Sequence, residues 1–285
     1  THTTEESSAA SDVYKRQGLL LLESNETADV NIKVTGIQWK WEYDYIDEDG
    51  VKFISQLDEA SEKARKLGSG VDASKVENYL LDVDNPIVVP EKKRVRLLIT
   101  AADVLHAWWV PALGVKRDAI PGFINESWFY ANEPGTYRGQ CAELCGKDHG
   151  FMPIVVKVVS QADYDTWLTA QKSAASASAQ EDTKTFTMEE LMKRGEGVYA
   201  KSCAACHQAN GEGITGAFPG IKGSSIALAD DPAAHIDIVV NGKPGTAMAA
   251  YKSQLSKADL AAVITFERNA FGNNKGDMVQ PSDIK

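Results

Sequence analysis

All four cysteines of the chain stand in two short motifs that can do metal or cofactor chemistry. The first motif is Cys141-x-x-x-Cys145, and the second is Cys203-x-x-Cys206-His207. Thiolates are soft ligands that favour copper and zinc over hard cations. The sequence therefore predicts two separate chemical sites.

The first motif lies close to two further soft donors. His149 contributes an imidazole and Met152 a thioether, both within the stretch Gln140–Pro153. A Cys-x-x-x-Cys pair alone would favour a disulfide or a zinc site. The added imidazole and thioether favour copper instead.

Two thiolates on one tight loop can bridge two copper ions, each with one imidazole as a terminal ligand. A second histidine is then required. His106 is the only candidate in the strand-rich part of the chain apart from His2 near the N-terminus, and we expect it at the end of a strand over Val95–Thr100. The prediction is a dinuclear copper centre that transfers electrons.

The second motif has the spacing for covalent attachment of a c-type haem, with His207 as an iron ligand. A buried disulfide or redox pair beside a chance histidine is the alternative. Met248, in a loop before the last predicted helix, is the expected sixth ligand. His235 is its rival, but its place on a predicted helix is typical of an ordinary surface or core histidine.

Alternating apolar residues predict the strands that must position the first site. Strands over Val30–Val34 and Ile37–Tyr45 are expected on either side of a bulge at Gly36. Many short strands are typical of a sandwich or barrel. The further predicted strands are Ile87–Val89, Val95–Thr100, Trp128–Ala131, Tyr137–Gln140 and Ile154–Val159.

The segment Leu57–Leu81 interrupts the strands and is interpreted as a surface insertion without chemistry, helical over Glu59–Leu67. After the last strand Ser160 can cap a short helix over Gln161–Gln171. The Ser- and Ala-rich residues 173–185 are predicted to be a flexible linker. The strand-rich domain is accordingly assigned to residues 29–172.

Helical patterns dominate residues 186–285, which we assign to a second, all-α domain. Thr187 and Glu190 form a capping box before a helix over Met188–Ser202. Ser256 and Asp259 form a second such pair before the last predicted helix, Leu260–Phe271. A further helix is predicted over Ala233–Val240.

The composition limits the possible functions. A chain of 285 residues with 43% hydrophobic residues can bury two cores. Its 40 acidic against 30 basic residues argue against nucleic-acid binding. No window reaches the roughly 20 apolar residues that cross a bilayer. Residues 1–28 are expected to be a leader, truncated or artefactual, because Asp12–Gln17 reads like a translated transposon end.

The first site resembles the CuA domain of cytochrome c oxidase subunit II, over about Asp29–Trp167. The resemblance implies a cupredoxin-like Greek-key barrel. The stretches that carry it are Gly36-Ile-Gln-Trp-Lys-Trp-Glu-Tyr, Val110-Pro-Ala-Leu-Gly-Val-Lys-Arg-Asp-Ala-Ile-Pro-Gly and Gly135-Thr-Tyr-Arg-Gly-Gln-Cys-Ala-Glu-Leu-Cys-Gly.

The same resemblance implies roles for individual residues. The main copper ligands would be His106, Cys141, Cys145 and His149, with Met152 as an axial ligand and the Glu143 carbonyl as a further one. The Glu143 side chain would bind a magnesium ion shared with subunit I. Trp39 would lie where electrons enter, and Lys116–Asp118 would face subunit I. Phe123 replaces an arginine found in many relatives.

The second domain resembles class I cytochromes c over about Phe186–Gly272, although Ala249 replaces the proline that usually follows the axial methionine. A c-type cytochrome fused behind a CuA domain is similar to subunit II of bacterial oxidases that carry their own cytochrome c. The implied function is electron transfer from a soluble or membrane-bound cytochrome c donor, through haem c and CuA, to subunit I, which reduces dioxygen to water.

That resemblance also implies a location and partners. The full-length protein would be anchored by two N-terminal transmembrane helices absent from this chain, on the periplasmic face of the bacterial inner membrane, beside subunits I and III. The chain alone would be catalytically incomplete, because none of its residues is placed to do acid, base or nucleophilic chemistry. A soluble two-centre electron shuttle is the alternative. Nitrous oxide reductase would need a propeller, and no blade-length repeat is present.

Overall fold

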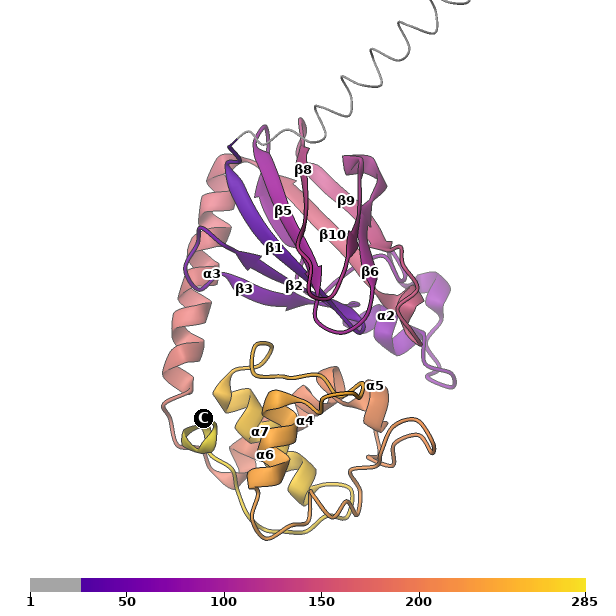
Figure 1. Ribbon diagram of the computed structural model, residues 1–285, viewed down its shortest axis with the longest axis vertical. Helices are drawn as coiled ribbons and strands as arrows, with labels where there is room; N and C mark the ends of the chain where they lie inside the picture. The colour runs from indigo at the N-terminus through magenta and orange to yellow at the C-terminus, as the bar shows by residue number, and fades with distance from the viewer. Residues whose placement is uncertain (1–26) are drawn as a thin grey trace, which may run out of the picture. The chain divides into compact units, whose positions relative to one another are not determined.

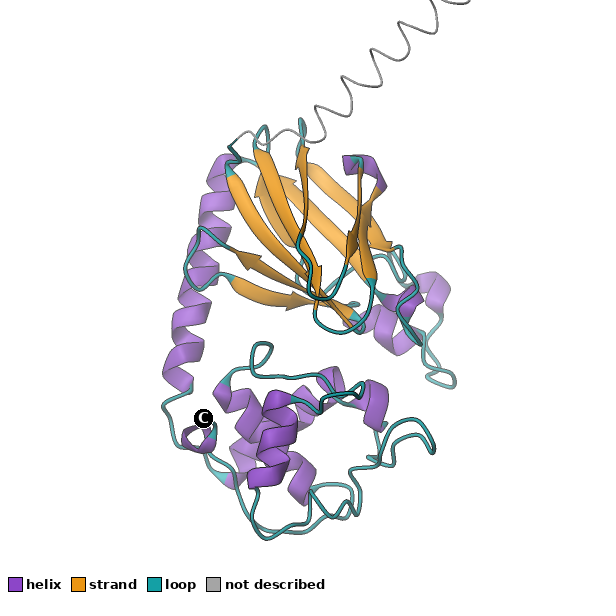
Figure 2. Ribbon diagram, in the orientation of Figure 1, coloured by secondary structure: helices purple, strands orange, loops and turns teal. Residues whose placement is uncertain are grey.

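The computed structural model describes residues 27–285, and the chain divides between Lys172 and Ser173 into two compact units. The first unit is built mainly of strands and the second of helices (Figure 2). His2 and the possible transposon-derived residues lie outside the described part. No helix within residues 27–285 combines the length and the apolar character that a membrane span requires.

Two five-stranded sheets face one another in the first unit (Figure 1). One has the strand order β3-β2-β1-β5-β8, and the other has the order β4-β10-β9-β6-β7. The pairs β1/β5 and β4/β10 are parallel. The strands are β1 (Val30–Ile37), β2 (Lys40–Tyr45), β3 (Lys52–Ser55), β4 (Ile87–Pro90), β5 (Arg94–Ala101), β6 (His106–Val110), β7 (Val115–Ala119), β8 (Asn125–Tyr130), β9 (Gly135–Cys141) and β10 (Pro153–Val159).

The core of this unit lies between the two sheets. Strand β5 alternates strictly between buried and half-buried residues, because successive side chains point to opposite faces of a strand. Trp41 from one sheet and Trp108 from the other are both fully buried in the same apolar cluster. The two sheets therefore share one core, as the predicted sandwich or barrel requires.

The predicted bulge at Gly36 is wrong. Strands β1 and β2 instead form an antiparallel hairpin in which Ile37 pairs with Lys40, and Gln38 and Trp39 form the turn. A bulge and a two-residue turn both change the parity of an alternating pattern, so the pattern alone cannot separate them. The hairpin places Trp39 at a tip rather than within a strand.

The predicted position of His106 is also wrong. His106 is the first residue of a separate strand, β6, and does not lie at the end of the predicted strand Val95–Thr100, which corresponds to β5. Strand β6 was missed because four of its five residues are buried, which leaves no alternation to detect. Strand β7 was missed because its three central residues, Lys116–Asp118, are charged and exposed.

The second unit is built around two helices that pack closely, α4 (Met188–Ser202) and α7 (Lys257–Asn269). The predicted capping box is confirmed, since the side chains of Thr187 and Glu190 cap each other's backbone N–H. The other helices are α5 (Ala204–His207) and α6 (Ala233–Asn241), with the short 3-10 turn η4 (Pro281–Asp283) near the C-terminus.

Helix α3 (Gln161–Glu181) continues ten residues beyond its predicted end at Gln171. It therefore includes 173–181, the first part of the segment predicted to be a flexible linker. Alanine is the strongest helix former, and the Ser- and Ala-rich composition that suggested a linker is compatible with a helix.

The insertion between β3 and β4 contains the helix α2 (Glu59–Ala64) and the 3-10 turn η1 (Ala73–Lys75). The helix begins at the predicted residue and ends three residues earlier than predicted. Two more 3-10 turns are η2 (Pro111–Leu113), which follows β6, and η3 (His149–Phe151), which begins with the predicted copper ligand His149.

Candidate copper and haem sites

All the predicted copper residues except His106 lie between Cys141, at the end of β9, and Met152, just before β10. This segment is called the copper loop. Cys141 is the last residue of β9, and its N–H donates to the Met152 carbonyl at 3.0 Å, which closes the loop at its base. The N–H of Ala142 donates to the carbonyl of Ala107 at 3.0 Å. The loop is therefore fixed to β6, the strand that begins with His106.

The soft donor atoms converge in this loop. The two sulfurs of Cys141 and Cys145 are 3.8 Å apart. His106 Nδ1 is 3.9 Å from Cys141 Sγ, and His149 Nδ1 is 3.4 Å from Cys145 Sγ. Met152 Sδ lies 4.0 Å from Cys145 Sγ. Each thiol thus has its own imidazole, which fits a pair of thiolates shared between two soft metal ions.

The structure also brings Glu143 to this group, through its backbone. The Glu143 carbonyl oxygen is 3.4 Å from Cys141 Sγ, whereas the residue itself is exposed. No disulfide links any of the four cysteines. The arrangement is compatible with the predicted roles of the carbonyl at the metals and of the side chain at the surface.

His106 is fully buried and held from behind by Asp103, a residue that the sequence prediction did not include. Asp103 Oδ1 lies 2.9 Å from His106 Nε2, so Nδ1 faces the thiols. Burial raises the pKa of Asp103, but hydrogen bonds from His106, Gln38 N–H and Val104 N–H outweigh it and hold that pKa below its ordinary value. A carboxylate behind a ligating imidazole is the usual support of a metal site. The only signal for it in the sequence is the Asp-x-x-His spacing.

The two neighbouring thiols shift each other's pKa values in opposite directions, because their sulfurs lie 3.8 Å apart. The contact with Cys145 lowers the pKa of Cys141 well below its ordinary value, burial opposes this, and His106 adds to the lowering. The contact with Cys141, together with burial, raises the pKa of Cys145. Thiols must be deprotonated to bind metal, so metal binding here would release a proton.

Trp39 contacts the copper loop from the tip of the β1–β2 hairpin. Its Nε1 donates to the Cys145 carbonyl at 3.1 Å, and Gln38 Nε2 donates to the same oxygen at 2.8 Å. Trp39 is half-buried. The indole ring is thereby one hydrogen bond away from the backbone of a predicted ligand.

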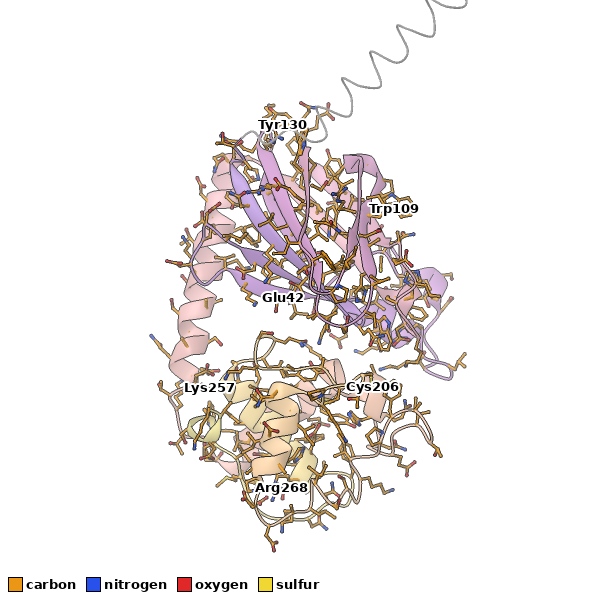
Figure 3. The ribbon with its side chains drawn as sticks, viewed as in Figure 1. Glu42, Trp109, Tyr130, Cys206, Lys257 and Arg268 are labelled. Carbon is orange, nitrogen blue, oxygen red and sulfur yellow. The ribbon has the colours of Figure 1, made fainter. Side chains whose placement is uncertain are left out.

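The haem motif begins where α4 ends. Cys203 is buried, Cys206 lies on α5 (Figure 3), and His207 is half-buried. The N–H groups of Cys206 and His207 both donate to the Cys203 carbonyl, at 3.1 and 3.0 Å, forming a tight turn. His207 Nδ1 is 2.8 Å from the Pro219 carbonyl, which leaves Nε2 for an iron atom.

The loop that carries Met248 is attached to the same end of α4. The Tyr251 hydroxyl donates to the carbonyl of Ser202 at 2.7 Å, directly before Cys203. Burial raises the pKa of Tyr251, and the thiols of Cys203 and Cys206 act in the same direction because they lie nearby. Met248 packs against the apolar cluster that contains Cys203. The predicted axial residue therefore packs against the cluster that contains the first cysteine of the motif.

His235, the rival to Met248, has another role in this structure. It is buried on α6, and its Nε2 lies 2.8 Å from Glu267 Oε2 on α7. The pair joins two helices within the core, as expected for an ordinary core histidine.

These two groups of residues, one on a strand-built unit and one on a helical unit, fit a class of protein that carries a soft-metal centre and a haem. Comparison with known proteins identifies the family of each unit. Residues 30–159 match the family model "Cytochrome C oxidase subunit II, periplasmic domain", and residues 190–266 match "Cytochrome C oxidase, cbb3-type, subunit III". The chain thus carries a subunit II periplasmic domain followed by a cytochrome c domain. The predicted resemblance and fold class are confirmed.

Individual relatives agree with this assignment. A probable cytochrome c oxidase subunit 2 of Rickettsia prowazekii is 48% identical over 147 residues, which are 52% of this chain and 44% of the relative. The cytochrome c oxidase subunit 2 of Cereibacter sphaeroides is 44% identical, covering 50% of this chain and 49% of the relative. The chain spans about half the length of these curated relatives.

A solved structure is similar to about half of this chain. The periplasmic domain of cytochrome oxidase subunit II of Bradyrhizobium japonicum has 42% sequence identity, with a TM-score of 0.44. The match covers 53% of this chain and 99% of that structure.

Proposed function

We propose that this chain is the electron-transfer subunit of a respiratory haem-copper oxidase. Electrons would pass from a cytochrome c-type donor through haem c to CuA, and then to subunit I for reduction of dioxygen to water. The observation that carries the proposal is the thiol pair of Cys141 and Cys145, flanked by one imidazole on each side, within a domain that matches subunit II.

The proposed copper ligands are His106, Cys141, Cys145 and His149, with Met152 as an axial ligand and the carbonyl of Glu143 as a further one. The bound copper pair supplies one-electron redox chemistry. Support comes from the convergence of these atoms and from the loop that β6 holds in place. We further propose that the exposed Glu143 side chain binds magnesium together with subunit I.

In the helical unit, Cys203 and Cys206 would attach haem c covalently, with His207 and Met248 as its axial ligands. The His207 Nδ1 contact to the Pro219 carbonyl supports this proposal, because it orients Nε2 away from the backbone. The anchoring of the Met248 loop at the end of α4 supports it as well.

The remaining roles follow from the proposed function. Trp39 would be where electrons enter, which its hydrogen bond to the Cys145 carbonyl supports. The exposed residues Lys116–Asp118 would face subunit I, and subunit III would complete the membrane partners. We place residues 29–172 and 186–285 as two domains on the periplasmic face of the inner membrane, anchored by two N-terminal transmembrane helices in the full-length protein.

A spectrum of the purified, metal-loaded chain tests the proposal. We expect a haem c absorption band and a mixed-valence dicopper paramagnetic resonance signal. Reduced cytochrome c with dioxygen should then load the chain with electrons without sustained oxygen consumption, because the proposal assigns the reduction of dioxygen to subunit I. A single zinc ion per copper loop, or continuous oxygen consumption, would contradict the proposal.

A further inference from the structure

The insertion Leu57–Leu81 is firmly attached to the strand-built unit. Leu57 forms a β-bridge with Val83, and the buried Ser61 hydroxyl accepts from the N–H of Leu80 at 3.1 Å. The Asp82 carboxylate, one residue after the insertion, lies 3.4 Å from the guanidinium of Arg138 on β9. Helix α2 is consequently held in a fixed position beside the strand that leads into the copper loop.

Arg65, at the C-terminal end of α2, reaches from the insertion to the copper loop. Its Nη1 and Nη2 atoms each lie 3.4 Å from one oxygen of the Asp148 carboxylate. Its guanidinium carbon also lies 4.4 Å from the centroid of the Phe151 ring. Glu62 binds the same guanidinium on its other side, at 2.5 Å. A planar guanidinium that pairs and stacks at once fixes geometry more tightly than a lysine would.

Asp148 is placed so that this contact affects a metal ligand. It directly precedes His149 and stands at the start of η3, yet its side chain makes no capping hydrogen bond to that turn. Its side chain is only 8% exposed and its carboxylate is directed to Arg65, with Lys147 as a second cation at 3.5 Å. A buried carboxylate of this kind is costly unless it is paired.

The imidazole of His149 has no hydrogen-bond partner behind it that corresponds to Asp103 behind His106. His106 is held at Nε2 by Asp103, whereas among the described residues no side chain or carbonyl lies within hydrogen-bonding distance of His149 Nε2. Ligating imidazoles usually have such a partner. The orientation of His149 must then come from its backbone, which η3 and Asp148 define.

We propose that Arg65 is a positioning residue for His149, and that the insertion holds the copper loop in its metal-binding shape through the Arg65–Asp148 pair. The inference rests on the proposed copper function. It gives a role to a segment in which the sequence shows no chemistry. The electrostatic pair, the ring contact with Phe151 and the fixed attachment of α2 all act on the same short turn.

The test compares Arg65→Gln with Lys66→Gln in the copper-loaded chain of 285 residues. Lys66 follows Arg65 and also pairs with Glu62, but it makes no contact with Asp148. We expect Arg65→Gln to release copper to a chelator roughly tenfold faster, the lower end of the effect of removing an outer support of a ligand. We also expect it to change the copper hyperfine pattern. Lys66→Gln should match the unchanged protein within about twofold.

Two further variants identify the interaction. Asp148→Asn should reproduce the faster release and the altered hyperfine pattern, and the double variant should be no worse than either single one, because both remove the same contact. Arg65→Lys should rescue only part of the effect, and these variants decide the matter if Arg65→Gln does not fold.

The measurements separate a failure of the proposed copper function from a failure of the proposed role of Arg65. An unchanged chain that does not bind a copper pair would refute the proposed function. A normal copper pair in the unchanged chain, with release rates and hyperfine patterns of Arg65→Gln and Asp148→Asn equal to those of Lys66→Gln, would refute the role of Arg65. A lower melting temperature with no change at the copper signal would also refute it.

Discussion

His106 and His149 face the two thiols in the same way but are supported differently. His106 is buried, and Asp103 holds its Nε2. Gly36 lies against its ring so closely that a Cβ there would be 2.7 Å from His106 Cδ2. His149 is half-buried and belongs to a one-turn helix on the loop. The rigid half of the site is therefore the His106 half.

Changing Asp103 to Asn tests that support. Asp103 Oδ1 accepts from His106 Nε2 and from the Val104 N–H, and Oδ2 accepts from the Gln38 N–H. Asparagine is uncharged and keeps only one accepting oxygen, so it cannot satisfy all three donors. We expect copper retention against a chelator to fall at least about tenfold. Asp49→Asn, on an exposed turn, is the control and should leave retention unchanged. Equal retention in both variants would show that Asp103 does not support the site.

At the level of the helices, α4 and α7 pack so closely that a glycine is needed. A Cβ on Gly195 would lie 2.2 Å from the Ala262 carbonyl oxygen and 2.6 Å from Phe266 Cβ. Two residues along α4, a Cβ on Gly197 would meet nothing within 4 Å. The two positions have the same helical backbone and differ only in their neighbours.

Alanine substitutions at these positions should have opposite effects. Gly195→Ala should lower the free energy of unfolding of the helical unit by about 1–3 kcal/mol, because overpacking outweighs the gain in helix propensity. Gly197→Ala should raise it by up to about 1 kcal/mol. Denaturant titrations of the full chain, followed by haem absorption, measure both. Equal stabilisation by the two variants would mean that α4 and α7 do not approach this closely.

At the level of the whole chain, both proposed redox sites belong to one polypeptide. Helix α3 ends at Glu181, and α4 begins at Met188, so the two sites are connected by a helix and a short coil. Two sites that are tethered meet at an effective concentration set by their connection and not by the concentration of the protein.

Haem-to-copper electron transfer should therefore be intramolecular. After rapid reduction of the haem in a chain with oxidised copper, the half-time of haem reoxidation should stay constant over a tenfold dilution. Absorbance changes of the two centres measure it. A half-time that lengthens in proportion to the dilution would show that electrons pass between separate molecules.

The sequence alone was enough to predict the chemistry that we propose for both sites and to determine the class of each unit. Ligand types and their spacing along the chain are local, covalent properties, so the soft donors near Cys141 and the motif at Cys203 could be found without coordinates. The capping box at Thr187 and the strict alternation of β5 are local in the same sense, and the helices and strands that they predict are present.

Only the tertiary structure decided how the donors are held. Asp103 and His106 are three residues apart, but their contact depends on a strand, β6, that has no alternating pattern. Arg65 and Asp148 are separated by 83 residues. A local sequence pattern cannot report a contact between distant segments, because that contact exists only after the insertion has packed against the barrel. For this reason the proposed ligands of the copper site could be named from the sequence, whereas the residues that we propose position them could not.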